Sequence, residues 1–440
     1  MSTRSSSARI PALTPAARRA RGGTLVIGGG FGGAYVAKLM GKRGATIVSP
    51  ESSMLYTPML PEVAAGAIEP RHVAVPLRIM CPDAELVLGR AVALDESTSS
   101  VTVETPSGTI QIQYENVVIA LGAVVRMLPI PGLAEHGLGF KNLADAIHLR
   151  NHLLGKLDAA DAEPEHAERH LTFVFVGAGY AGVEALAELT DFVRDVRPHY
   201  PSLAWTAPRW VLVDAGERIL GEVPERLGDY AAKRLRKRGV DIRLGTTLER
   251  VDEHAVHLSD GSRLETETLV WTAGVRPHPL VAELGLPLDE RSRIRVDSSL
   301  RVEGRDNVWA LGDCAAVPNE ATPGQFDPPT CQHALRQSRR LAKNLKGNEK
   351  AYGYRMIGQG ATLGRDRGIA NLFGHISFRG FPGAMVTRMY HLHQLPLRSR
   401  KLRVVADTML SRIFGRDMAE LGLLEPSVGE PASAAETLAA

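Results

Sequence analysis

The feature that most constrains the fold of this chain is a glycine-rich turn between an apolar strand and a helix. Residues 24–40 read TLVIGGGFGGAYVAKLM and place Gly28, Gly30 and Gly33 at the spacing G-x-G-x-x-G. The first glycine permits a tight turn, the second lets a pyrophosphate approach the backbone, and the third lets the helix pack closely on the strand. The N-terminus of the helix adds N–H donors and a positive dipole. Such a turn is typical of a dinucleotide-binding unit, although glycine-rich turns also occur without a ligand.

The same arrangement is repeated further along the chain. Residues 171–189 read LTFVFVGAGYAGVEALAEL and place Gly177, Gly179 and Gly182 at the same spacing. Two such units, each in a strand–turn–helix context, are hard to explain as accidents of packing. We therefore predict an α/β fold with two Rossmann-like dinucleotide-binding domains. We expect one to bind a flavin dinucleotide and the other a nicotinamide dinucleotide, because a flavin needs a partner with which it exchanges hydride.

Composition excludes several other classes of protein. With 440 residues, of which 44% are hydrophobic and 23% charged, the chain is globular and long enough for two or three domains. A net charge of +3 gives no reason to expect a nucleic acid as partner. Cys81, Cys314 and Cys331 have no C-x-x-C spacing, which argues against a disulfide framework, a metal site or a dithiol relay and fits a reduced, intracellular setting. No run of 18 apolar residues is present, so the sequence predicts no membrane-spanning helix.

The order of these segments predicts a domain organisation. A basic leader without an apolar h-region is expected to be disordered, with a transit-like peptide as the alternative. The expected segments are the disordered leader over 1–22, the FAD-binding domain over 23–150 and again over 291–350, the NADH-binding domain over 165–290, a C-terminal α-rich region for membrane association or dimerisation over 351–425, and a disordered tail over 426–440.

Residues at the ends of later predicted strands add polar groups to both units. Asp214 ends the strand WVLVD of the second unit, at the position where ribose hydroxyls are bound. Its charge would repel a 2′-phosphate, so the sequence favours NADH over NADPH; the alternative is a solvated carboxylate at a strand end. In the first unit the corresponding residues are Ser49 and Pro50, and a serine hydroxyl can also hydrogen-bond a ribose. Asp313 follows the strand VWAL, where it could reach a bound flavin dinucleotide or, alternatively, cap a helix.

Six segments together resemble the type II NADH:quinone oxidoreductases (alternative NADH dehydrogenases), within the flavoproteins that have two dinucleotide-binding domains. They are IGGGFGGAYVAKLM, SPESSMLYTPMLPEVAAG, FVGAGYAGVEALAEL, VWTAGVRP, VWALGDCA and PPTCQHALRQSRRLAKNL, and the resemblance covers residues 22–425. It implies that the first unit binds FAD and the second binds NADH. It also implies that electrons pass from NADH through FAD to menaquinone or ubiquinone without proton pumping.

The resemblance further implies a set of site residues. In the family, the loop that here contains Thr57 and Pro58 lies beside the isoalloxazine ring, and the residue matching Glu184 lies near the region of hydride transfer. The expected FAD contacts are Gly28, Gly30, Phe31, Gly32, Gly33, Ser49, Pro50, Thr57, Pro58, Ala120, Gly122, Gly312, Asp313, Gln332, His333 and Ala334. The expected NADH contacts are Gly177, Gly179, Tyr180, Ala181, Gly182, Glu184, Asp214, Ala273 and Gly274. The expected catalytic residues are Glu184, Gln332 and Arg336.

One departure from the family affects the expected electron acceptor. The quinone-site helix of the family typically reads A-Q-x-A-x-Q, whereas Cys331 replaces the first alanine here and Arg336 replaces the second glutamine. Two alternatives therefore stay open: a soluble NADH-dependent reductase (diaphorase) with a non-quinone acceptor, and a flavoprotein redox sensor whose reduction changes partner binding. Sulfide:quinone reduction would need a cysteine pair beside the flavin, which the cysteine spacing does not indicate.

The C-terminal region carries a basic, amphipathic segment. Residues 379–416 contain eight lysines and arginines against one acidic residue, and apolar residues recur at helical spacing at Leu402, Val405, Met409 and Ile413. Such a helix can lie in the interface of an anionic bilayer. We therefore expect peripheral association with the cytoplasmic face of the cell membrane. The alternative is a helix that packs on its own domain, and a homodimer is a further alternative partner.

Overall fold

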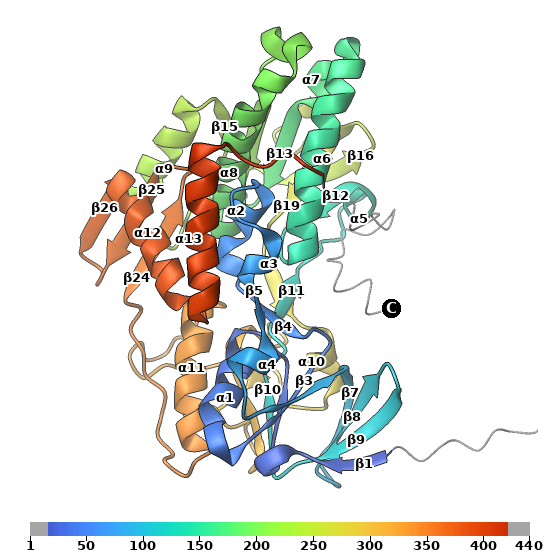
Figure 1. Ribbon diagram of the computed structural model, residues 1–440, viewed down its shortest axis with the longest axis vertical. Coiled ribbons are helices and arrows are strands. Elements are labelled where there is room, and N and C mark those ends of the chain that lie inside the picture. The colour runs from blue at the N-terminus through green and yellow to red at the C-terminus, as the bar shows by residue number, and fades with distance from the viewer. Residues whose placement is uncertain (1–15, 421–440) are drawn as a thin grey trace, which may run out of the picture.

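The computed structural model describes residues 16–420, and Figure 1 shows an elongated molecule with the amino-terminal unit at one end. The expected tail over 426–440, and residues 1–15 of the expected leader, lie outside the described residues. The remaining residues form two α/β units and a C-terminal region that packs along both of them.

The first unit is built on a five-stranded parallel sheet in the order β22-β10-β2-β3-β6. Its strands are β2 (Thr24–Ile27), β3 (Thr46–Ser49), β6 (Glu85–Leu88), β10 (Asn116–Ile119) and β22 (Val308–Ala310). The helices α1 (Phe31–Met40) and α11 (Cys331–Asn344) pack against each other beside this sheet. Because β22 and α11 come from residues beyond 291, the first unit is assembled from two separate parts of the chain.

A second sheet of the first unit corrects the expectation for the leader. Its order is β1-β9-β8-β7, with β1 (Ala16–Arg19), β7 (Arg90–Asp95), β8 (Ser100–Thr105) and β9 (Gly108–Gln113). Residues 16–19, which were expected within a disordered segment, pair in parallel with β9. The backbone of an edge strand offers unpaired N–H and C=O groups, and β1 satisfies them on β9. This pairing depends on a distant segment, so the local composition of the leader does not reveal it.

The second unit contains the other five-stranded parallel sheet, in the order β12-β19-β13-β14-β15. Its strands are β12 (Gly137–Gly139), β13 (Thr172–Val176), β14 (Arg209–Val213), β15 (Val240–Arg243) and β19 (Thr268–Trp271). Because β12 pairs with β19, the chain enters this unit by residue 137, whereas the expected boundary of the first segment was 150. Between the units, β11 (Ala123–Val125) and β20 (Val275–Pro277) form an antiparallel pair. The helices α6 (Leu143–Ala162) and α8 (Tyr180–Val196) cover the second unit on the side of the C-terminal region (Figure 1).

The C-terminal region contains the expected helices and, in addition, a small sheet. Three antiparallel strands, β24 (Gly358–Thr362), β25 (Gly368–Leu372) and β26 (Ile376–Gly380), precede α12 (Phe381–Gln394) and α13 (Arg398–Ile413). The strands carry four glycines, a composition that disfavours strands in isolation. A Cβ on Gly368 would stand 2.7 Å from the Cα of Ala384, so glycine at this position allows α12 to lie directly on the sheet.

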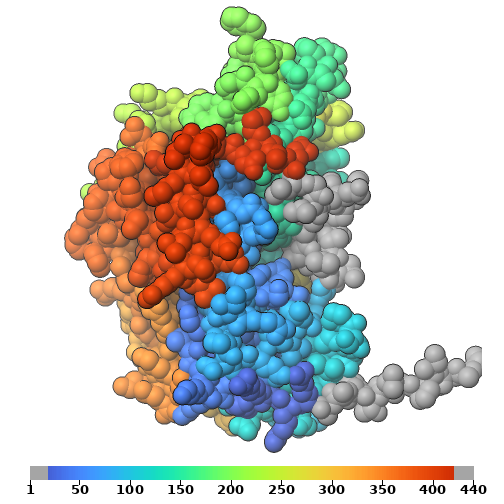
Figure 2. Space-filling model, viewed as in Figure 1, coloured from blue at the N-terminus to red at the C-terminus, as the bar shows by residue number. Residues whose placement is uncertain are grey.

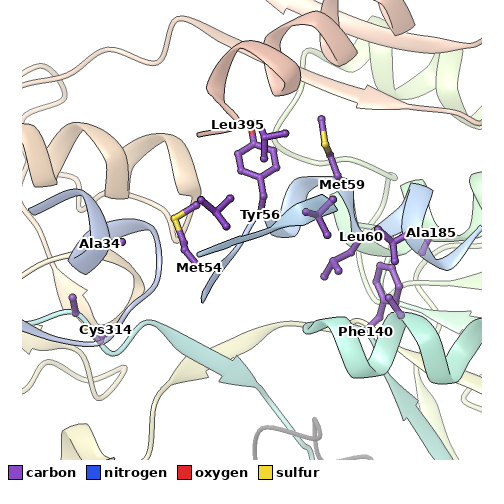
Figure 3. Packing of buried hydrophobic residues seen from close by; sticks show 14 of the residues in the cluster. Ala34, Met54, Tyr56, Met59, Leu60, Phe140, Ala185, Cys314 and Leu395 are labelled. Atoms are coloured by element: carbon purple, nitrogen blue, oxygen red, sulfur yellow. The ribbon is translucent and has the colours of Figure 1, made fainter. Parts of the chain in front are cut away.

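The segment after Tyr56 joins these three parts. It forms the 3-10 helix η3 (Thr57–Met59) and the short helix α2 (Leu60–Ala64), which packs against α8 and α6. Figure 3 shows buried side chains from α1, α2, α8 and the C-terminal region around it, and they belong to one continuous hydrophobic cluster. The two units and the C-terminal region therefore share a core.

The remaining elements connect these sheets. The helices are α3 (Pro70–Val73), α4 (Leu77–Met80), α5 (Leu133–His136), α7 (Ala167–His170), α9 (Glu225–Lys237) and α10 (Leu280–Glu283). The strands are β4 (Ser53–Leu55), β5 (Ala74–Pro76), β16 (Leu248–Asp252), β17 (Ala255–Leu258), β18 (Arg263–Glu265), β21 (Ile294–Arg295) and β23 (Ala315–Ala316).

Candidate active site

The first glycine turn has the geometry of a dinucleotide cradle. Gly28 adopts φ +109°, and a Cβ at this position would collide with the carbonyl oxygen of Ala120. A Cβ at Gly33 would collide with the carbonyl oxygen of Gly28. Gly30 is different, because it is the N-cap of α1, no side chain caps the helix there, and no atom lies within 4 Å of the position of a Cβ. The N-terminal N–H groups of α1 therefore face open space that a pyrophosphate fits.

The other residues expected to contact FAD gather at the carboxyl ends of the same strands. A Cβ on Gly29 would stand 2.7 Å from the Ser49 hydroxyl at the end of β3. Gly32 lies against Leu311, which directly follows β22, and a Cβ on Gly312 would stand 3.8 Å from that of Ala334. Ligands of open α/β sheets bind at this edge.

The predicted flavin loop reaches the same place. The ring of Tyr56, which directly precedes Thr57 and Pro58, lies 5.5 Å from the ring of Phe31 in the first turn of α1. The sequence placed this loop beside the flavin only through the family resemblance. The aromatic contact provides the physical link between the loop and the glycine turn.

A cavity of about 700 Å³ continues from this edge along the N-terminus of α11. Gly312, Asp313, His333 and Ala334 line it, together with Ala123 of β11. The Asp313 carboxyl has no hydrogen bond to the described residues, and burial raises its pKa. A half-buried carboxyl without a protein donor is well suited to the hydroxyls of a ribityl chain.

His333 belongs to a buried polar network that the sequence did not predict. Its Nδ1 lies 2.6 Å from Oδ2 of Asp327 and 3.1 Å from the hydroxyl of Tyr352. Gln337 donates to Asp327 (2.8 Å) and accepts from the backbone N–H of Gly312 (2.8 Å). The network thus couples the start of α11 to the Gly312–Asp313 turn. The only sequence signal for Asp327 is its position directly before the two prolines that precede α11.

Gln332 and Arg336 lie on a different face of α11 and contact the C-terminal region. The Gln332 amide donates to the carbonyl of Gly358 (2.8 Å) and accepts from the hydroxyl of Tyr354 (3.1 Å). The guanidinium of Arg336 lies over the ring of Tyr354, 5.1 Å from its centre. Within the described residues the second N–H of the amide has no partner, so it remains able to donate to an acceptor. Tyr354 is a neighbour that sequence reasoning missed.

The second glycine turn repeats the geometry of the first. Gly177 adopts φ +108°, and a Cβ at Gly182 would collide with the carbonyl of Gly177. Gly179 is the N-cap of α8 with open space around its Cβ position, and Tyr180 and Ala181 form the first turn of this helix. The residues Ala273 and Gly274 follow β19 at the same edge of the sheet. The residues expected to contact NADH in this turn are therefore brought together.

Asp214 is not the freely solvated carboxylate of the alternative interpretation. One oxygen accepts a hydrogen bond from the N–H of Ala178 (2.6 Å), and the other accepts from the N–H of Gly216 (2.7 Å). The carboxylate therefore braces the glycine turn and at the same time stands at the edge where a ribose would bind.

Glu184 points away from its glycine turn and towards the C-terminal sheet. Its Oε1 accepts from the backbone N–H (2.8 Å) and the hydroxyl (3.2 Å) of Thr362 in β24. Burial raises the pKa of Glu184 to about 8, and Glu62 on α2 raises it further in the same direction. Thr362 and Glu62 come from distant segments, and sequence reasoning missed both.

Comparisons with known proteins agree with this arrangement. A family model for the pyridine nucleotide-disulphide oxidoreductases matches residues 23–338. The chain is 30% identical over 395 residues to the type II NADH:quinone oxidoreductase Ndh of Mycobacterium tuberculosis, covering 84% of each chain. It is also 30% identical over 438 residues to the mitochondrial internal alternative NAD(P)H-ubiquinone oxidoreductase A1 of Solanum tuberosum, covering 90% of this chain and 88% of the relative.

A solved structure extends the comparison to the fold. The structure of NDH2 from Plasmodium falciparum in complex with NADH superposes with a TM-score of 0.83 at 18% identity and covers 91% of this chain and all of that one. At this identity the likeness concerns the fold. From the family model and the two relatives, we conclude that this chain belongs to the pyridine nucleotide-disulphide oxidoreductases and, within them, to the type II NADH:quinone oxidoreductase family.

Proposed function

We propose that this protein is a non-proton-pumping NADH dehydrogenase that uses FAD to transfer electrons from NADH to a quinone. The observation that carries the proposal is the presence of two open dinucleotide cradles, each at the N-terminus of a helix, in a chain of this family. The glycine geometry and the unpaired Asp313 carboxyl both fit FAD in the first cradle. Bound FAD supplies the chemistry of hydride acceptance and onward electron transfer.

The residues of the chain then have separate roles. The N-terminus of α1 holds the pyrophosphate of FAD, and Asp313 accepts hydrogen bonds from hydroxyls of its ribityl chain. The N-terminus of α8 holds the pyrophosphate of NADH, and Asp214 excludes a 2′-phosphate by charge. On α11, the amide of Gln332 donates to a quinone carbonyl, and the cation of Arg336 favours negative charge on the quinone.

A soluble reductase with a non-quinone acceptor is the second candidate function. It is favoured by Arg336, which suits an anionic acceptor, and by the contacts of Gln332 with Tyr354 and Gly358, which a quinone would have to share.

We further propose that α13 attaches the protein peripherally to the cytoplasmic face of the cell membrane. The helix packs on α3 through the buried side chain of Val404, and Asp407 accepts from the N–H of Glu69 (3.1 Å). Its opposite face is apolar and open: the side chains of Leu402 and Ile413 are 71% and 72% exposed. In Figure 2 the helix lies on the outer surface of the molecule.

Part of the basic charge of residues 379–416 is neutralised by ion pairs within the molecule. Of the eight basic residues over 379–416, Arg388 and Arg416 pair with the buried carboxylate of Glu188. Arg412 pairs with Asp366 (3.0 Å), and others, including Arg398 and Arg403, remain available to anionic lipid headgroups. Within residues 16–420, no helix has the length and hydropathy needed to cross a bilayer.

The first prediction tests the FAD cradle. Purified protein should be yellow and release FAD rather than FMN. Gly30→Val should leave the fold intact, because its Cβ meets open space, but should weaken FAD binding by at least about tenfold by blocking the pyrophosphate. Gly155→Val, on the exposed side of α6, is the matched control and should retain flavin. Absorbance measures the flavin content, and circular dichroism checks the fold. A full flavin content in Gly30→Val would contradict the assignment of this turn to FAD.

The second prediction concerns the nicotinamide nucleotide. NADH should bleach the flavin faster than NADPH in anaerobic stopped-flow experiments. Asp214→Asn should narrow this preference by about tenfold, because it removes the charge that repels a 2′-phosphate. Asp260→Asn, an exposed turn residue of the same unit, should leave the preference unchanged. A wild-type protein that is reduced faster by NADPH would show that this role of Asp214 is wrong.

The third prediction separates the two electron acceptors. Gln332→Ala should lower the steady-state rate with short-chain menaquinone or ubiquinone by up to about tenfold through loss of one hydrogen bond, and should leave flavin reduction by NADH unchanged. Arg336→Gln, which restores the residue of the family, should raise quinone turnover or leave it unaltered. Arg339→Gln, exposed on the same helix, is the control. Fast ferricyanide reduction with no quinone turnover in any of these proteins would favour the soluble reductase.

The fourth prediction concerns α13. The double substitution Leu402→Ser and Ile413→Ser should weaken sedimentation with phosphatidylglycerol-containing vesicles by at least about tenfold, because both side chains would be buried in the lipid interface. Trp205→Ser, at an exposed site in the 3-10 helix η6 (Pro201–Trp205), is the control and should bind as the wild type does. If the wild-type protein does not bind vesicles but forms a dimer, and the double substitution disrupts that dimer, this face is instead a homodimer interface.

A further inference from the structure

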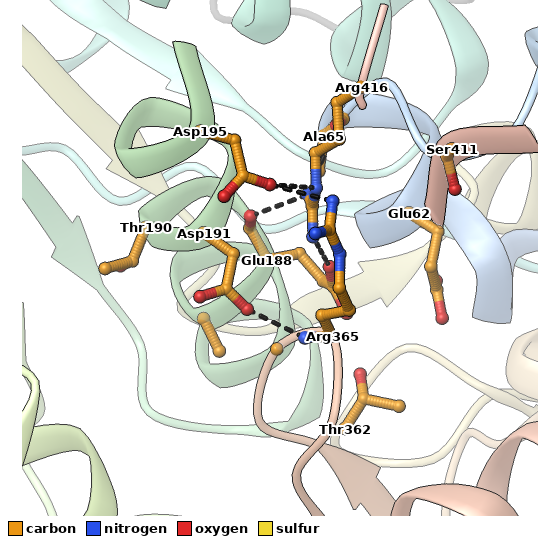
Figure 4. A network of polar contacts seen from close by, with 12 residues as sticks. Glu62, Ala65, Glu188, Thr190, Asp191, Asp195, Thr362, Arg365, Ser411 and Arg416 are labelled. Carbon is orange, nitrogen blue, oxygen red and sulfur yellow. Dashed lines mark hydrogen bonds and ion pairs between the residues drawn. The ribbon is translucent and has the colours of Figure 1, made fainter. Parts of the chain in front are cut away.

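Five carboxyl groups lie where α2, α8 and the C-terminal region come together, and we refer to them as the carboxyl cluster; Figure 4 labels four of them. Its members are Glu62, Glu184, Glu188, Asp191 and Asp195. Glu62 extends from α2 and the other four extend from α8. Burying several carboxylates together is unfavourable unless each charge is compensated by a cation or removed by a proton.

Three members of the carboxyl cluster are compensated by arginines. Glu188, which is 1% exposed, lies 2.9 Å from a guanidinium nitrogen of Arg388 and 2.7 Å from one of Arg416. The other two compensated members are Asp191 and Asp195. Asp191 pairs with Arg194 and Arg238 (each 2.7 Å), and Asp195 pairs with Arg365 (2.8 Å). These three groups are therefore satisfied as carboxylates.

Glu62 is not compensated in this way. Its side chain is only 12% exposed, and its nearest cation is Arg388, with 4.0 Å between Nε and Oε1. Its Oε2 is buried and has no hydrogen-bond partner in the described part of the chain. Figure 4 shows Glu62 apart from the Arg416–Glu188 pair and without a dashed contact. A buried carboxylate oxygen without a donor is costly, and protonation removes that cost.

Glu184 is the second uncompensated member of the carboxyl cluster. It is 9% exposed, its hydrogen bonds come from Thr362, and within residues 16–420 no lysine, arginine or histidine forms an ion pair with it. Its neighbour Glu62 acts on it as a like charge. Two nearby uncompensated carboxyls titrate together, because ionisation of one disfavours ionisation of the other.

Ionisable residues of the neighbouring segments do not supply the missing cation. From α6, Arg150 donates instead to the carbonyl of Asp417 (2.5 Å). Tyr56, before α2, is a neutral phenol whose own pKa is raised well above its usual value, mainly by burial. Burial also raises the pKa of Glu62, as does Glu188, while Arg388 and Arg416 only partly oppose the shift.

We propose that Glu62 and Glu184 share a proton. Each turnover with a quinone takes one proton from water, and Glu62 stores this proton and delivers it through Glu184. This inference rests on the proposed function. NADH provides two electrons and one proton as hydride, whereas a quinone needs two electrons and two protons to become a quinol. The missing proton leaves the carboxyl pair, which becomes more negative by one charge and is then reprotonated from water. Glu62 is thus a positioning residue, because it acts through Glu184.

The proposal predicts a difference between acceptors. Glu62→Gln keeps the shape of the side chain but cannot carry the proton, so it should lower quinone turnover at pH 8 by at least about tenfold. Ferricyanide takes electrons without protons, so its reduction by NADH should change by less than about twofold. Glu135→Gln, an exposed glutamate on α5, is the matched control and should change neither rate. Equal loss of both activities in Glu62→Gln, or loss of neither, would overturn the proposal.

The pH dependence of quinone turnover distinguishes a proton-carrying role of Glu62 from a purely structural one. Wild-type quinone turnover should decline as pH rises through about 8, where the carboxyl pair loses its proton. In Glu62→Gln this decline should shift to lower pH, because removal of the like charge lets Glu184 ionise more easily. Glu62→Asp retains a carboxyl and should move the decline back towards the wild-type position. An unchanged profile in Glu62→Gln would count against the pair.

Infrared spectroscopy of the protein without NADH or acceptor provides a test independent of turnover. At pH 8 the band of protonated carboxyl groups should weaken in Glu62→Gln, because Glu184 then ionises more easily, and should persist in Glu62→Asp and Glu135→Gln. If the wild type reduces ferricyanide but no quinone, the proposed function fails, and the infrared result still decides whether Glu62 holds a proton. A band of equal strength in wild type and Glu62→Gln would overturn the proposal whatever the acceptor.

Discussion

At Gly33 and Gly182 the helix after each glycine turn lies so close to the turn that a single methyl group would collide with the carbonyl oxygen of Gly28 or Gly177. This close approach sets the position of each helix on its strand and directs its N-terminal N–H groups into open space. Both candidate nucleotide sites depend on it, because a pyrophosphate binds to backbone groups that no side chain occupies. The polar groups at neighbouring strand ends, Asp313 and Asp214, are useful only when the backbone holds that geometry.

The second constraint is the junction at α2. This helix lies between the two nucleotide-binding units and the C-terminal region, and it shares their hydrophobic core. Buried ion pairs reinforce the junction, since Arg388 and Arg416 both meet Glu188. Such pairs add little net stability compared with apolar packing, but breaking one typically costs about 3–5 kcal/mol because a buried charge is left unpaired. The pairs therefore specify how α13 and its exposed apolar face are attached to the rest of the molecule.

The same junction also buries acidic groups of α2 and α8. Glu188 is neutralised by arginines, whereas Glu62 and Glu184 are not. The burial of Glu188 is thus compensated by charge pairing, and we propose that one shared proton compensates the burial of the other two. A fold that assembles an oxidoreductase from three parts can thus place a proton store at their common boundary without adding a separate domain.

The sequence by itself determined the two glycine turns, the strand ends that bear Ser49, Asp214 and Asp313, and the apolar stripe of α13, because each is a local pattern whose spacing reflects the backbone. It did not reveal that residues 16–19 form β1, that the second unit begins before residue 150, or that β24–β26 form a sheet. Those features depend on pairing with distant strands. Only the tertiary structure decided that Asp214 braces its own glycine turn, that Gln332 binds Tyr354, and that Glu184 accepts from Thr362. Contacts between side chains from separate elements, and the burial that shifts their pKa values, arise when the parts of the chain pack together.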